Sequence, residues 1–158
     1  SSDLDLDREH LTYGETSLAA TAQLLPLLHL VTYGCHCATP PPHPLRCVRC
    51  NGRGDGAVVF DLGSGTGNVL IGLSLLAATD SASGIAALRG FELLPPLHSA
   101  SLSVQHDLNC RVAASASLLP QPLPILNFVC ADLCEADLSS ADVLYMASTI
   151  FSADFMNT

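Results

Sequence analysis

The stretch AVVFDLGSGTGN, residues 57–68, decides the fold of this chain. It opens with the apolar run 57–60, which is typical of a strand buried on both faces of a sheet. Three glycines then alternate with other residues, and the stretch 69–78 that follows is apolar and free of proline, as expected of a helix packed on a sheet. A strand, a tight turn and a helix in this order predict the first unit of a parallel α/β sheet.

Working outward, the same alternation continues towards the C-terminus. A second strand is predicted to end near Phe91 and Glu92, a third to span residues 125–130, and a fourth to span residues 141–146. Strands that alternate with helical connections imply right-handed crossovers. The predicted fold class is therefore α/β, with a Rossmann-like, mostly parallel sheet.

The helical segments are expected around these strands. A helix begins over residues 93–102, where Pro95 and Pro96 fit only the first turn. Residues 110–124 are expected to be irregular. Near the N-terminus, Thr16 or Ser17 is a reasonable cap for a helix that Pro26 weakens or ends.

The composition narrows the classes of function. The 158 residues are 49% hydrophobic, which fits a single folded domain with one core. The net charge is −9 with only six Lys and Arg residues, so a broad electrostatic grip on nucleic acid is not expected. The acidic first residues do not resemble a secretory signal, and the apolar run 24–31 is too short to span a bilayer. We expect an intracellular protein without a membrane partner, whose cysteines are thiols or metal ligands.

A segment rich in proline and cysteine, residues 32–56, interrupts the regular pattern and reads as an insertion. Its cysteines form two close pairs: Cys35 with Cys37, and Cys47 with Cys50. Two such pairs could hold zinc in a tetrahedral site, with His36 as a substitute ligand. The alternative is an insertion with free thiols. Outside this segment, we expect Cys110, Cys130 and Cys134 to be small residues in or near the core.

The spacing of the glycines indicates the kind of ligand. Gly63, Gly65 and Gly67 form a G-x-G-x-G loop, whereas the dinucleotide fingerprint is G-x-G-x-x-G. Asp61 stands just before them, where a carboxylate is unsuited to a pyrophosphate but suits an ammonium group. The alternative is a glycine-rich turn that binds nothing.

Two more carboxylates follow strands. Glu92 ends the second predicted strand, at an interval from the glycines close to the roughly 20 residues after which an acidic side chain binds a ribose in related folds. Asp132 ends the third strand, where it can accept a hydrogen bond from an adenine amino group. The carboxyl ends of parallel strands form one crevice, so these side chains are expected to share a ligand.

Together these features resemble a known family. The segment 60–68 is similar to the first motif of class I S-adenosylmethionine-dependent methyltransferases, and the upstream Y-G-E-T at 13–16 resembles the disruptor-of-telomeric-silencing histone methyltransferases. Segments 91–95 and 142–151 look like that family's second and fourth motifs. The resemblance implies an S-adenosylmethionine-dependent histone-lysine N-methyltransferase located in the nucleus, with a protein lysine as acceptor.

The resemblance also implies roles for individual residues. The methionine end of the cofactor would be contacted by Tyr13, Gly14, Glu15 and Thr16. The loop around the cofactor would be lined by Asp61, Gly63, Gly65, Gly67 and Asn68. Glu92 would hold the ribose, and Asp132 with Leu133 would hold the adenine. The family carries two asparagines beside the transferred methyl group, where this chain has Ala147 and Ser148. Ser148 is thus the catalytic candidate.

The chain divides by this reading into a cofactor-lid segment (1–31), the insertion (32–56) and an S-adenosylmethionine-binding domain (57–158). A complete class I sheet has seven strands, so with four the domain is expected to be incomplete at its C-terminus. Two other functions stay open: a non-catalytic cofactor-binding module that needs a partner, and a methyltransferase for a small molecule or nucleic acid.

Overall fold

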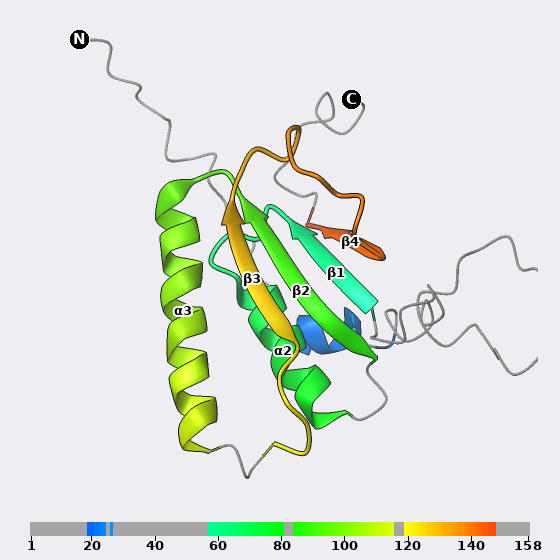
Figure 1. Cartoon of the computed structure of the whole chain (residues 1–158), viewed down its shortest axis with the longest axis vertical. Coiled ribbons are helices and arrows are strands. Elements are labelled where there is room, and N and C mark those ends of the chain that lie inside the picture. The colour runs from blue at the N-terminus through cyan, green and yellow to red at the C-terminus, as the bar shows by residue number, and fades with distance from the viewer. Residues whose placement is uncertain (1–18, 25, 27–56, 81–83, 116–118, 148–158) are drawn as a thin grey trace, which may run out of the picture.

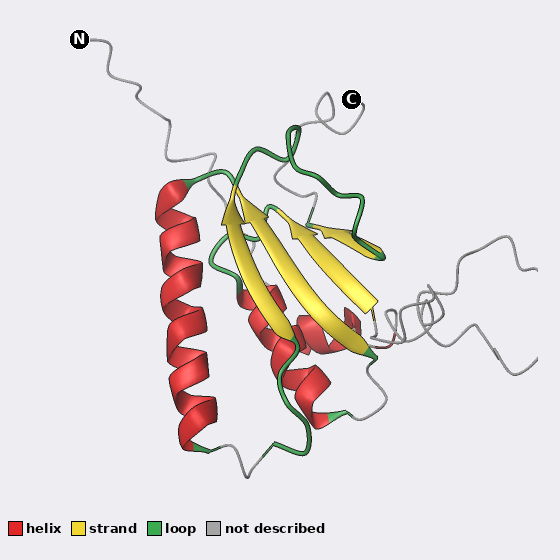
Figure 2. Cartoon of the chain, in the orientation of Figure 1, coloured by secondary structure: helices red, strands yellow, loops and turns green. Residues whose placement is uncertain are grey.

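The structure, a computed structural model, describes residues 19–24, 26, 57–80, 84–115 and 119–147. Within these ranges the chain forms a four-stranded sheet in the order β3-β2-β1-β4, in which every neighbouring pair is parallel. The elements alternate along the chain: β1 (Ala57–Leu62), α2 (Asn68–Thr79), β2 (Ile85–Glu92), α3 (Pro95–Ala114), β3 (Ile125–Cys130) and β4 (Val143–Met146). The predicted α/β, Rossmann-like parallel sheet is confirmed (Figures 1 and 2).

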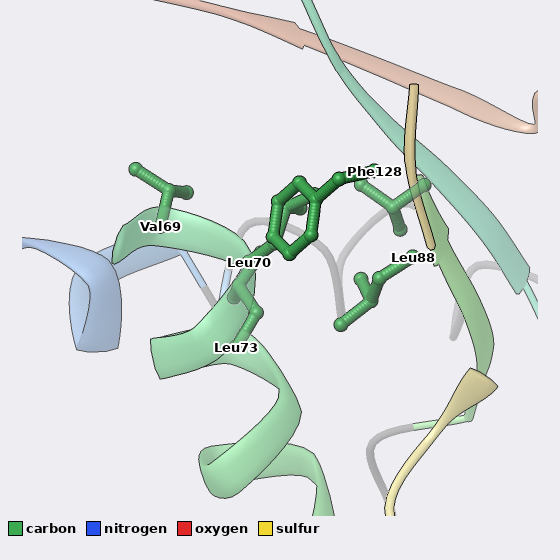
Figure 3. Packing of buried hydrophobic residues seen from close by; sticks show 6 residues of the cluster. Val69, Leu70, Leu73, Leu88 and Phe128 are labelled. Carbon is green, nitrogen blue, oxygen red and sulfur yellow. The ribbon is translucent and has the colours of Figure 1, made fainter. Parts of the chain in front are cut away.

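Helices α2 and α3 lie on the same face of the sheet (Figure 2). Successive strand residues point to opposite faces, so alternate apolar residues of each strand meet these helices. Val59, Leu88 and Phe128, one from each of three strands, pack against the α2 side chains in the cluster shown in Figure 3. This cluster fixes α2 directly beneath the strand ends where the glycine loop lies.

Within the described ranges, a connection without a helix covers the opposite face of the sheet. Phe60, Leu62 and Phe91 pack against side chains of the connection 131–142, which forms turns only. The connection must cross three inter-strand spacings of about 4.8 Å and return along the sheet, and a helix, rising only about 1.5 Å per residue, would leave too little reach.

Asp142 attaches the edge strand β4 to β1. Its Oδ2 accepts a 2.9 Å hydrogen bond from the Val58 amide, and its own amide donates to the Val58 carbonyl at 2.9 Å. We expect Asp142→Ala to lower the free energy of unfolding by about 1–3 kcal/mol, because the Val58 amide loses a charged acceptor. Urea unfolding checks this, with Asp107→Ala on the exposed part of α3 as the control. Equal losses in both variants would contradict the assignment.

Several local predictions need correction. The segment 110–124 was expected to be irregular, but α3 continues to Ala114, and Arg111 in its last turn suits the negative end of the helix dipole. Pro95 and Pro96 do occupy the first turn, as predicted. Pro26 is itself helical, as are residues 19–24, and the residues after it, where the helix was expected to weaken or end, lie outside the described part of the chain.

The cysteine prediction outside the insertion is also wrong. Cys110, Cys130 and Cys134 are exposed free thiols and not part of the core. Cys110 lies on the outer side of α3, and Cys130 lies in an edge strand, so neither position is covered by another layer.

Among the helices described, none has the length and apolar character needed to cross a membrane.

Candidate functional site

The glycine loop connects β1 to α2 at the point where the strand order reverses. β2 and β3 lie on one side of β1 and β4 lies on the other, and ligands of open parallel sheets bind at such switch points. The amides of Gly63 and Ser64 both donate to the Phe91 carbonyl at 2.9 Å. The loop is thereby held across the carboxyl ends of β1 and β2, whose arrowheads lie together in Figure 1.

Two glycines of the loop have different surroundings. Both have positive φ, 56° at Gly65 and 84° at Gly67, a region that side chains rarely adopt. A Cβ on Gly67 would lie 2.7 Å from Phe128 Cε1, so Gly67 is needed for packing. A Cβ on Gly65 would meet no atom within 4 Å. The open side of the loop is therefore at Gly65, where a ligand can approach the backbone.

Glu92 ties the loop to the neighbouring strand and helix. Its Oε2 accepts a hydrogen bond from the Gly65 amide at 2.8 Å, and its Oε1 accepts one from the Leu94 amide at 2.9 Å. The side chain is only 7% exposed. Since each carboxylate oxygen can accept two hydrogen bonds, both retain capacity for a hydroxyl group of a ligand.

Asp61 is a second buried carboxylate at this edge. It pairs in register with Gly90 of β2 and Tyr145 of β4, and only 2% of its surface is exposed. Burial, and secondarily the charge of Glu92, raise the pKa of Asp61 to about 7. Near neutral pH the site therefore exchanges a proton readily, and its negative charge disfavours phosphates and favours cations.

The predicted cofactor residues fall into three groups. The structure brings together Asp61, Glu92 and the loop residues Gly63, Gly65 and Gly67, with Asn68 as the exposed first residue of α2. Asp132 lies at the same sheet edge but is exposed, and its Oδ1 accepts a 2.9 Å bond from the Cys134 amide. Leu133 packs on the opposite face, against the cluster of Phe60, Leu62 and Phe91.

The remaining predicted residues lie outside the part of the chain that is described. They are the methionine-contacting candidates Tyr13, Gly14, Glu15 and Thr16, the catalytic candidate Ser148, and the zinc candidates Cys35, Cys37, Cys47 and Cys50. Within the described ranges, no group of three or more His, Cys, Asp or Glu side chains is arranged to hold a metal ion.

Sequence reasoning missed two parts of the site. The Leu94 amide holds Glu92 from the side of α3, and the Phe128 ring supports the loop from below at Gly67. The sequence feature that could have revealed the position of Phe128 is Gly90. A glycine inside a strand often marks the close approach of another group. Gly90 pairs in register with Phe128, and a Cβ there would lie 2.6 Å from the Phe128 ring.

No protein-family model matches the chain, and no curated protein matches it either. Among solved structures, the chain is similar to an RNA methyltransferase from Salinibacter ruber in complex with S-adenosyl-L-homocysteine, with 26% identity and a TM-score of 0.40. The match covers 68% of this chain and 60% of that one, so the chain spans about three fifths of the methyltransferase's length.

Proposed function

We propose that the chain binds S-adenosylmethionine at this edge of the sheet and serves methyl transfer. One observation carries the proposal: two buried carboxylates, Asp61 and Glu92, end adjacent parallel strands beside a glycine turn whose open side is at Gly65. A nucleotide phosphate would meet two carboxylates there. A ligand with sugar hydroxyls and a positively charged amino-acid end meets acceptors suited to both.

The residues of this edge fit such a ligand. Asp61 would accept a hydrogen bond from the ammonium group of the methionine end, and the second lone pairs on the Glu92 oxygens would accept hydrogen bonds from the ribose hydroxyls. Oδ2 of Asp132, whose partner oxygen holds the Cys134 amide, would serve the adenine amino group. The Y-G-E-T residues 13–16 would complete the methionine end, as the family resemblance implies.

The chemistry requires little from the protein beyond positioning. The bound cofactor supplies an activated methyl group on its sulfonium, so the side chains need only hold the acceptor in line and exclude water. We assign a protein lysine as the acceptor, with histone as the substrate and the nucleus as the location, following the resemblance. The net negative charge of the chain, with 15 Asp and Glu residues and six Lys and Arg residues, favours a protein over a nucleic acid as the methyl acceptor.

Cofactor binding is tested by calorimetric titration with S-adenosylhomocysteine. We expect Glu92→Gln to weaken binding at least tenfold, because an amide oxygen replaces a charged acceptor of ribose hydroxyls and one of the two amide partners is left unsatisfied. The matched control is Asp107→Asn, which makes the same type of change on the exposed side of α3. Unchanged affinity in Glu92→Gln, or no binding by the parent chain, would overturn the proposal.

The acceptor is tested by measuring the transfer of labelled methyl groups in three reactions, which contain histone, RNA or no added acceptor. The chain has no lysine of its own, so label found on a lysine must lie on the acceptor. Label on histone lysine is the expected result. Label on RNA would replace the acceptor assignment, and cofactor binding without transfer to any acceptor would identify a binding module.

A further inference from the structure

We infer that Asp61 and Glu92 select for a positively charged ligand end by exchanging it for a proton: when the ammonium group of the ligand binds, Asp61 gives up its proton to solvent. The inference rests on the proposed function, because it concerns the same ligand. It adds a rule that the proposal does not contain, namely that affinity for the amino-acid end is coupled to proton release and affinity for the nucleoside end is not.

The geometry of the pair carries the inference. Asp61 follows Val59 by two residues and Glu92 follows Gly90 by two, so both carboxyl groups face the helix side of the sheet on neighbouring strands. Both are buried, and both Glu92 oxygens already act as acceptors for backbone amides. Asp61 is therefore the member of the pair that is left to hold a proton, because two neighbouring buried carboxylates disfavour double ionisation.

The surroundings offer little to neutralise the pair. On β2, Arg89 faces the opposite side, with its guanidinium 5.2 Å from the centre of the Phe60 ring. On β4, Tyr145 pairs with Asp61 and adds no positive charge, while Asp142 binds the Val58 amide on β1.

The helices add one titratable group on this side of the sheet. Residues 19–24 and α2 contain no ionisable side chain, and those of α3 beyond its first turn, His106, Asp107, Cys110 and Arg111, are exposed. This leaves His98 in the first turn of α3. Its Nδ1 is buried and has no hydrogen-bond partner within the described ranges. Among the described residues, then, no permanent cation faces the pair, and a stable positive charge has to arrive with the ligand.

The exchange is balanced in protons and charge. A protonated Asp61 carboxyl and a ligand ammonium become a carboxylate–ammonium pair plus one proton in solvent. Because burial and the charge of Glu92 raise the pKa of Asp61 to about 7, the carboxyl is mostly protonated at pH 6. As the pH increases towards 7, the affinity for the ammonium-bearing ligand should then increase about tenfold per pH unit. Above pH 7 the affinity should be constant.

The test counts protons by calorimetry in pairs of buffers with different ionisation enthalpies. S-adenosylhomocysteine carries the ammonium, and 5′-methylthioadenosine is its counterpart without the amino-acid end. At pH 6 we expect S-adenosylhomocysteine to release close to one proton per site and 5′-methylthioadenosine to release none. At pH 8 neither should release a proton.

Variants assign the source of the proton. Asp61→Asn should abolish proton release while 5′-methylthioadenosine binds as before, and His98→Asn and Asp107→Asn should leave release unchanged. Binding of S-adenosylhomocysteine without proton release, equal release by both ligands, or loss of release in His98→Asn would overturn this inference and leave the proposed function standing. Failure of both ligands to bind the parent chain would instead overturn the proposed function.

Discussion

Gly90→Ala should lower the free energy of unfolding by about 3 kcal/mol, because the added methyl group has no room in the packed core. The new Cβ would lie 2.6 Å from Phe128 Cδ1, 2.7 Å from Ser64 Oγ and 2.8 Å from Ser64 Cβ. Neither neighbour can easily move, because Phe128 lies in the core cluster and Ser64 is 8% exposed within the glycine loop. Denaturant unfolding followed by circular dichroism measures the loss.

Gly65→Ala is the matched control for this substitution. It adds the same methyl group where no atom lies within 4 Å, so its cost is that of a positive φ alone, about 1 kcal/mol. In the double variant Gly90→Ala/Phe128→Leu, the smaller leucine side chain replaces the ring and relieves one of the two clashes. Its loss in free energy of unfolding should therefore be smaller than the sum of the losses in the two single variants. Equal destabilisation by Gly90→Ala and Gly65→Ala would contradict the close approach of Phe128 and Ser64.

Asp61→Asn should remove a pH-dependent cost of up to about 4 kcal/mol, which follows from a pKa raised from 3.8 to about 7. The unfolded chain loses this proton near pH 4 and the folded chain only near pH 7. Below pH 4 both states are protonated and burial of the ionised group costs nothing. As the pH rises from 4 to 7, Asp61 ionises in the unfolded state only, which lowers the free energy of that state. The free energy of unfolding therefore falls in the parent and not in the variant.

The measurement is the difference in free energy of unfolding between variant and parent, taken from pH 4 to pH 8. Titration of other groups largely cancels in this difference, which should increase by roughly 1.4 kcal/mol per pH unit over most of the range. Asp107→Asn, on the exposed side of α3, is the matched control for the loss of one carboxylate. A constant difference for Asp61→Asn would mean that the carboxyl is not held protonated by burial and by Glu92.

Much of the fold could be predicted because its first half is locally encoded. The apolar run and the glycines at 57–68 specify a strand, a turn and a helix through neighbours in the chain, and the structure has β1 and α2 there. The third strand was predicted at residues 125–130, where β3 lies, since its apolar residues stand between clear breaks in the pattern. The carboxylates Asp61 and Glu92 were found for the same reason, as the polar ends of buried strands.

The features that the sequence could not predict depend on distant parts of the chain. The connection 131–142 must cross the whole sheet, a requirement visible only once β4 is known to pair with β1 on the side away from β3. Asp132 was predicted as a third ligand-binding carboxylate, and only the structure shows that its Oδ1 accepts a hydrogen bond from the Cys134 amide and leaves Oδ2 for a ligand. The exposed thiols of Cys110 and Cys130 follow from their positions on an outer helix and an edge strand.

The sequence by itself determined that a glycine turn and two strand-end carboxylates exist, because turn chemistry and burial periodicity are local properties of the chain. Only the tertiary structure decided that Asp61 and Glu92 are both buried, that Glu92 holds the amides of Gly65 and Leu94, and that Phe128 leaves no room at Gly90. These features depend on the register of three parallel strands, which arises from packing between residues far apart in sequence.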